Sequence, residues 1–146
     1  ERLDAEGLLL RVKDYTSLIA ATGKLRQWRD AVAFLDAMLA RKHDPNVAAF
    51  SALVGACATG SQPARALSLL GEMEHRSLPP NVVTYTSAIA ACEWGQRWEQ
   101  ALVLLRRMRD DVVAPSIITY GAAISSCSRA AQWAAAVALL AEAAGR

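Results

Sequence analysis

The sequence repeats itself at a fixed interval of 35 residues. Aromatic residues mark the interval, at Tyr15, Phe50, Tyr85 and Tyr120 (50−15, 85−50, 120−85). Further columns with this period hold proline at 45, 80 and 115, cysteine at 57, 92 and 127, and leucine at 35, 70, 105 and 140. Such self-similarity indicates one supersecondary unit copied in tandem, each copy burying its apolar face against its neighbours. The function of the chain is therefore expected on a surface built from equivalent positions.

The segment from Val82 to Ser116 shows what the unit contains. Its first part carries apolar side chains at helical spacing, at Val82, Tyr85, Ile89 and Cys92. Gly95 interrupts this pattern, and a second helical stripe follows at Ala101, Leu102, Leu105 and Met108. Each copy is therefore a predicted helix-turn-helix hairpin, and the chain an all-α solenoid. The period places first helices near 13–23, 48–58, 83–93 and 118–128, and second helices near 28–41, 63–75, 98–110 and 132–143.

These units divide the chain into one continuous array. Residues 1–11 align with the end of a preceding partial repeat, and repeats follow at 12–46, 47–81 and 82–116, with an incomplete one at 117–146. Solenoids normally need polar capping units at both ends. We therefore expect the chain to be part of a longer protein, or to have a partner that covers its ends.

Composition and charge narrow the classes of partner. Hydrophobic residues make up 53% of the chain, enough for a continuous core, and the net charge is only +2. The longest apolar run, 133–141, is well short of the roughly 18 residues that a membrane span requires, so no transmembrane segment is predicted. Phosphate contacts supply most nonspecific affinity for nucleic acids. A near-neutral array must therefore gather its basic residues on one strip or bind something else.

The three cysteines occupy equivalent positions of successive repeats. Equivalent positions in stacked helices lie about 8–10 Å apart, whereas a disulfide needs Cα atoms within about 7 Å. A zinc site is disfavoured because no cluster of histidine and cysteine accompanies them. The sequence predicts small, buried, reduced thiols in a reducing intracellular compartment.

Nothing in the sequence resembles a catalytic constellation. His43 and His75 are isolated near turns, and the chain has neither a phosphate-binding glycine-rich motif nor the His-x-Glu and Cys-x-x-Cys set of a zinc deaminase. We predict a non-catalytic chain without cofactor or metal.

Four features together resemble the pentatricopeptide repeat family, in its organellar algal and plant form. These are the 35-residue period, the segment from Asn81 to Cys92, the Trp-x-x-Ala-Leu-x-Leu-Leu run at 98–105, and the segment from Met108 to Pro115 near the end of the repeat. The tetratricopeptide repeat differs in its period of about 34 residues and its Trp-x-x-Leu-Gly opening. The resemblance implies a right-handed superhelix that binds single-stranded RNA in plastids or mitochondria, about one base per repeat, in transcript stability, processing or translation.

In that family, two residues of each repeat read the edge of one base. By resemblance they are Thr16 with Asn46, Ser51 with Asn81, Thr86 with Ser116, and Gly121 with a position that would fall at 151 (116+35). The family pattern implies adenine for Thr or Ser paired with Asn. Hydroxyl and amide groups do offer donors and acceptors to a base. The alternative is that Asn46, Asn81 and Ser116, each following a proline just before a helix, are helix N-caps.

Other positions of the family pattern imply contacts to the rest of a nucleotide. Val83 and Ile118 stand where the family sandwiches a base, and Lys13, Lys24 and Arg129 stand where phosphate contacts are expected. Lys24 and Arg129 are equally explained as cations near helix C-termini, where the helix dipole favours them. Trp94 has no counterpart in the other repeats, so it is a candidate base or protein contact, or an incidental surface residue.

Two binding functions follow from these observations. The first is an organellar RNA-binding protein, which the family resemblance favours. The alternative is a protein-binding scaffold or accessory subunit of a large organellar complex, such as a ribosome or a photosynthetic or respiratory assembly. The small number of repeats and the weak charge favour this alternative.

Overall fold

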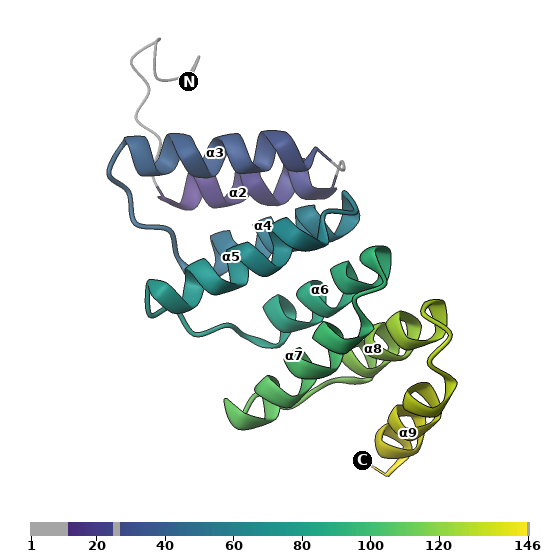
Figure 1. Ribbon diagram of the computed structural model, residues 1–146. Helices are drawn as coiled ribbons and strands as arrows, with labels where there is room; N and C mark the ends of the chain where they lie inside the picture. Colours follow the sequence, from purple (N-terminus) through teal and green to yellow (C-terminus); the bar gives the residue numbers. More distant parts are fainter. Residues whose placement is uncertain (1–11, 25–26, 146) are drawn as a thin grey trace.

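The computed structural model describes residues 12–24 and 27–145. Within these residues the chain forms eight α-helices, one short 3-10 helix and no strand (Figure 1). The first helices of the hairpins are α2 (Val12–Lys24), α4 (Val47–Thr59), α6 (Val82–Cys92) and α8 (Ile117–Arg129). The second helices are α3 (Trp28–Ala40), α5 (Pro63–His75), α7 (Trp98–Asp110) and α9 (Trp133–Ala144). Residues 1–11, assigned above to a preceding repeat, lie outside the described residues.

The predicted all-α solenoid is confirmed. Each first helix begins 35 residues after the last (47−12, 82−47, 117−82), and α2, α4, α6 and α8 contact one another in succession. In Figure 1 the hairpins descend in chain order from α2 and α3 at the top to α8 and α9 at the bottom. The main difference from the expected helices is at α6, which ends at Cys92 and continues as the 3-10 helix η1 (Glu93–Gly95). Gln96 then closes the turn in the left-handed region, at φ 52°.

The aromatic and methionine columns of the repeat contribute to the core. The four periodic aromatic residues are at most 3% exposed, and the periodic methionines of the second helices are fully buried, at Met38, Met73 and Met108. The Tyr85 hydroxyl donates a hydrogen bond to Asp111, which follows α7. Burial, this bond and the Asp111 charge raise the pKa of Tyr85 above its usual range.

The outer face of α9 departs from the pattern of the columns. Leu35, Leu70 and Leu105 are at most 7% exposed, whereas the equivalent Leu140 is 61% exposed. Trp133, which the period predicts to be a packing residue like Trp28 and Trp98, is 65% exposed. The reason is that no described hairpin packs against this side of α9.

The three cysteines are buried, as the sequence predicts, and none of them is paired in a disulfide. Burial raises the pKa of each thiol, and that of Cys92 to about 11. The thiols are therefore protonated at neutral pH, and the thiolate is the reactive form.

Thiol labelling should therefore report folding. At pH 8 we expect slow modification of the native chain by a thiol reagent, and rapid modification of three thiols in guanidinium chloride, because unfolding removes both the burial and the pKa shift. Rapid labelling of the native chain, or fewer than three thiols after unfolding, would contradict this arrangement of the cysteines.

Candidate functional site

The residues that end the repeats cap the helices that follow. The Oδ1 of Asn46 accepts a hydrogen bond from the Ala49 N–H (2.9 Å), and the Oδ1 of Asn81 accepts one from the Thr84 N–H (3.0 Å). The Oγ of Ser116 does the same for Thr119 (3.2 Å). The N-cap interpretation is thus confirmed. It leaves base reading open, because capping uses only the carbonyl arm of each asparagine and no described residue accepts a bond from the amino arm of Asn81.

A buried threonine joins the two members of the central base-reading pair. The Oγ1 of Thr84 lies 2.6 Å from the Oγ of Ser51 and 2.9 Å from the Oδ1 of Asn81. In the next repeat, the Oγ1 of Thr119 lies 2.7 Å from that of Thr86, and 3.0 Å from the Ser116 hydroxyl. We call each of these three-residue chains a hydroxyl relay.

Sequence reasoning missed the two relay threonines. The available signal was a hydroxyl residue three positions after an N-cap, the spacing of a capping box. Both α6 and α8 have a complete capping box, with Thr84 and Thr119 at this position. Helix α4 has Ala49 there, so the first pair, Thr16 and Asn46, has no such relay.

One groove runs along α4, between α2 and α6. Its volume is about 520 Å³, and Ser51, Asn81, Val83 and Lys24 line it. Its floor is made of small residues, Ala20, Ala52, Gly55 and Ala56. The structure therefore brings together one predicted base-reading pair, a sandwiching residue and a phosphate-contact lysine.

A second groove occupies the equivalent place between α6 and α8. It measures about 330 Å³ and is lined by Val83, Thr86, Ser116 and Ile118. Val83 is 57% exposed and Ile118 74%, so both present apolar surface to solvent. Val83 lines both grooves, as does Ser87.

The remaining predicted site residues lie elsewhere. Thr16, Asn46 and Gly121 line neither of these two grooves. Lys13 belongs to α2, but its side chain is outside the described part of the structure. Lys24 is exposed and forms no ion pair with a described residue.

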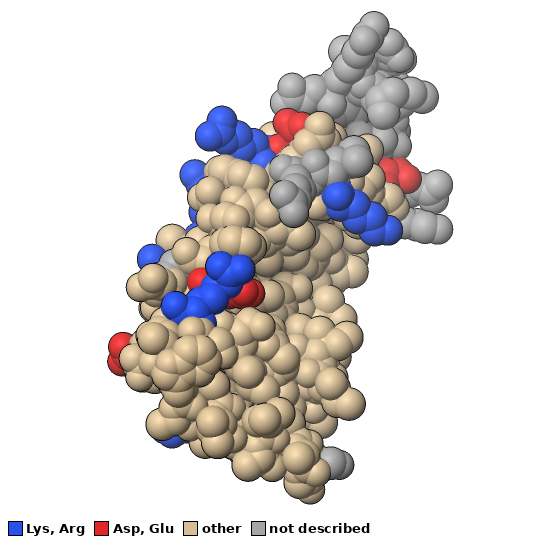
Figure 2. Space-filling model, turned by 90° about the vertical axis from the view of Figure 1, so that its right-hand side faces the viewer, with Lys and Arg blue, Asp and Glu red and all other residues tan. Residues whose placement is uncertain are grey.

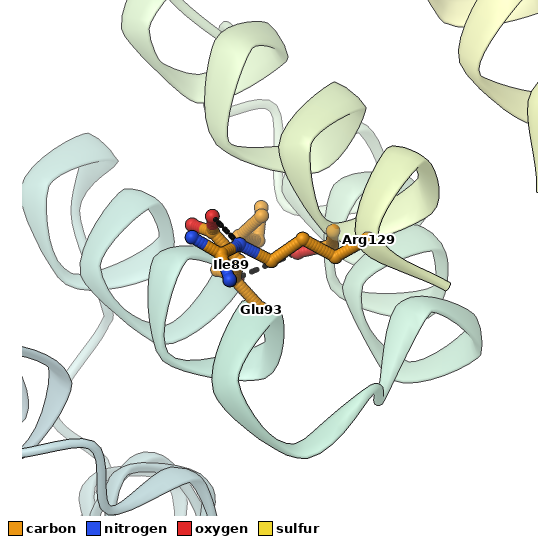
Figure 3. A network of polar contacts seen from close by, with 4 residues as sticks. Ile89, Glu93 and Arg129 are labelled. Carbon is orange, nitrogen blue, oxygen red and sulfur yellow. Dashed lines mark hydrogen bonds and ion pairs between the residues drawn. The ribbon is translucent and has the colours of Figure 1, made fainter. Parts of the chain in front are cut away.

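Arg129 and Trp94, predicted as separate contacts, form one cluster with Glu93. The Nε of Arg129 lies 2.5 Å from the Oε1 of Glu93, and Figure 3 shows Arg129 reaching from α8 to Glu93 at the end of α6. The guanidinium carbon lies 4.9 Å from the centre of the Trp94 ring, within the range of a cation–π contact. Trp94 is 53% exposed. Glu93 thus balances the charge that Arg129 would offer to a phosphate.

Positive charge is dispersed rather than gathered into a strip. Three arginines pair with glutamates that lie on second helices: Arg76 with Glu72, Arg107 with Glu74, and Arg109 with Glu142. Figure 2 shows one side of the molecule, where Lys and Arg form separate patches, one of them against acidic side chains, and much of the surface is uncharged. On this side the described Lys and Arg side chains therefore do not form a continuous basic strip.

Within residues 12–24 and 27–145, no group of three or more His, Cys, Asp or Glu side chains is arranged to hold a metal ion. None of the helices in this part of the chain combines the length and apolar character needed to cross a membrane.

Solved structures share this fold. The PPR domain of Arabidopsis thaliana protein-only RNase P 1, crystallised in complex with tRNA, aligns with a TM-score of 0.82 at 15% identity, over 97% of this chain and 75% of that one. Maize PPR10 aligns at 0.78 and 20% identity, over 99% of this chain and 21% of that one. PPR10 in complex with an 18-nt psaJ RNA element aligns with a TM-score of 0.71 at 24% identity, over 94% of this chain and 20% of that one. The chain thus spans about a fifth of the length of PPR10.

Sequence comparison gives the family. No curated protein matches the chain in sequence. The sequence profile of the pentatricopeptide repeat domain matches residues 1–59 and 68–129, and that of the single PPR repeat matches residues 48–78. Since the first profile covers well over half of the chain, the chain belongs to the pentatricopeptide repeat family.

Proposed function

We propose that this chain is a non-catalytic module that binds single-stranded RNA along the grooves of its first helices. The observation that carries the proposal is the convergence of Ser51, Asn81 and Val83 on one groove, repeated by Thr86, Ser116 and Ile118 in the next. Two equivalent grooves, one repeat apart, match a ligand that is itself a repeating chain. In each, apolar side chains can stack on a base face while hydroxyl or amide groups meet its edge.

The chemistry of the groove along α4 favours adenine there. Asn81 is an exposed amide, and Ser51 is a hydroxyl at the inner side of the groove. The small residues of the floor leave room for a purine. By resemblance to the family, Thr or Ser paired with Asn also implies adenine, for Thr16 with Asn46 as well as for Ser51 with Asn81.

The comparisons support RNA as the ligand class. PPR10 was crystallised with an RNA element and the PPR domain of protein-only RNase P 1 with tRNA. At 15–24% identity, the likeness to them supports the fold, and the assignment of bases to individual residues is our proposal. A role in transcript stability, processing or translation, in a plastid or mitochondrion, belongs to the same proposal.

A second candidate is a scaffold that binds protein subunits of an organellar complex. The specific observations that favour it are the Arg129–Glu93 pair, which balances the charge of a predicted phosphate contact, and the exposed apolar face of α9 at Trp133, Val137 and Leu140. Nothing in the structure identifies such a partner, so we place it second.

Binding to short RNAs tests the proposal. We expect fluorescence anisotropy to show weak binding of an adenosine-containing oligouridine. Each base contact contributes roughly 1–3 kcal/mol, and only two grooves are described. Each phosphate contact on a single strand adds about −0.7 to the slope of log K against log salt. With positive charge so dispersed, we expect a slope between about −0.7 and −2. Absence of binding, together with copurification of protein subunits by the same chain, would favour the scaffold.

A further inference from the structure

We infer that Thr84 fixes the direction of hydrogen bonding in the pair Ser51 and Asn81, and that the pair Thr86 and Ser116 has no fixed direction. This inference rests on the proposed function and adds a positioning residue to it. Its consequence is that the groove along α4 distinguishes bases with an exocyclic amino group from bases with a carbonyl at the same position. The second groove, between α6 and α8, accepts both.

The cap sets the orientation of the Asn81 amide. The backbone N–H of Thr84 can only donate, so the Asn81 atom 3.0 Å from it must be the carbonyl oxygen. The other arm of the amide is then the amino group. Asn81 therefore offers a donor to a ligand in the groove that it lines.

The relay sets the direction of the Ser51 hydroxyl. Thr84 has one hydroxyl proton, which it donates to the Asn81 Oδ1 at 2.9 Å, because this oxygen carries no proton of its own. The contact of 2.6 Å between the Ser51 Oγ and the Thr84 Oγ1 must then use the serine proton. Thr84 is fully buried, so its hydroxyl bonds to these residues rather than to bulk water. Ser51 is left with oxygen lone pairs, and therefore acts as an acceptor toward the groove.

One donor and one acceptor in fixed places discriminate between two classes of base. Adenine and cytosine carry an amino donor where guanine and uracil carry a carbonyl acceptor. The neighbouring ring nitrogen is an acceptor in the first class and a donor in the second. A pair with fixed polarity that suits one class therefore opposes the other. Since adenine is the base proposed for this pair, the favoured class is the one with the amino group.

The second relay lacks this constraint because Ser116 replaces the asparagine. Thr86, Thr119 and Ser116 each have one hydroxyl proton, and either atom can donate in both contacts between them. The Ser116 Oγ accepts from the Thr119 N–H in either case. The chain of protons can thus run in both directions, and Thr86 can be a donor or an acceptor toward a base.

The test compares affinities for an oligouridine that contains one adenosine with those for the same oligouridine containing one guanosine. All proteins carry Asn46→Ser, which keeps a helix cap and removes the amide of the first pair. In this background we expect an adenosine preference of about tenfold. Thr84→Ala should reduce it below about threefold, whereas Thr84→Ser, which keeps the hydroxyl, should retain it. Alanine is tolerated there, because Ala49 occupies the equivalent position of α4.

A gain of discrimination is expected in the second groove. Ser116→Asn should fix the direction of the relay through Thr119. Probes with two adjacent adenosines should then bind about tenfold more tightly than probes in which either one is guanosine. If Asn46→Ser protein shows the adenosine preference but Thr84→Ala keeps it, the relay inference is wrong and RNA binding stands. If neither the Asn46→Ser protein nor the unmodified chain binds the probes, the proposed function is wrong and the inference falls with it.

Discussion

Leu70→Ala is expected to lower the free energy of unfolding of this chain by about 2–5 kcal/mol, whereas Leu140→Ala should change it by no more than about 0.5 kcal/mol. The two residues belong to one column of the repeat, two periods apart (140−70). Leu70 is 1% exposed and Leu140 61%. Truncating Leu70 removes apolar contacts and leaves a cavity. Most of the Leu140 side chain is already exposed to water, so truncating it removes little buried surface.

Urea unfolding followed by circular dichroism measures both effects, and the pair is its own control because the substitution is identical. The slope of the free energy with urea should stay constant for Leu140→Ala. A reduced slope for Leu70→Ala would show that the hairpins no longer unfold together, as nearest-neighbour stacking allows. Equal losses at the two positions would contradict the stacking described for α5 and α9.

The sequence predicted the helices well because their signal is local and repeated four times. Apolar spacing within each unit gives the helices, and Pro45, Pro80 and Pro115 mark where each unit ends. The end of α6 was predicted to within one residue, and Gly95 marked the interruption, but the change to a 3-10 helix at Glu93 was not predicted. The exposure of Leu140 was missed because a column predicts burial only where a neighbouring hairpin is present.

The candidate site was predicted in its residues but not in its connections. Ser51 and Asn81 came from the family pattern, and the structure places both in the groove along α4. The bond from Ser51 to Thr84 joins residues 33 apart in sequence, and it exists only because α4 packs on α6. The pairing of Arg129 with Glu93, 36 residues away, arises in the same way between α6 and α8. Contacts between repeats therefore decide which predicted residues are available to a ligand.

Asn46→Asp with Asn81→Asp is expected to move the base preference from adenine toward guanine, by about tenfold or more in the ratio of affinities. Aspartate caps a helix as well as asparagine does, and its charge is favoured at a helix N-terminus. Stability should therefore change by no more than about 0.5 kcal/mol. The amino donor, however, is replaced by an acceptor, which suits the ring N–H and amino group of guanine. The substitution thus separates the two roles of each asparagine, because it keeps the cap and replaces the amino donor by an acceptor.

The ratio of affinities, measured with adenosine and guanosine probes, is the decisive quantity because two added negative charges weaken RNA binding in general. Gln100→Glu provides a control for the general effect of charge, since this exposed residue of α7 gains one negative charge away from both grooves. It should lower affinity for both probes equally. Asn46→Ala with Asn81→Ala completes the set, because alanine removes the cap and the donor together. If that variant loses stability but binds both probes as the unmodified chain does, the asparagines act only as helix caps. The protein-binding scaffold would then be the better explanation of these grooves.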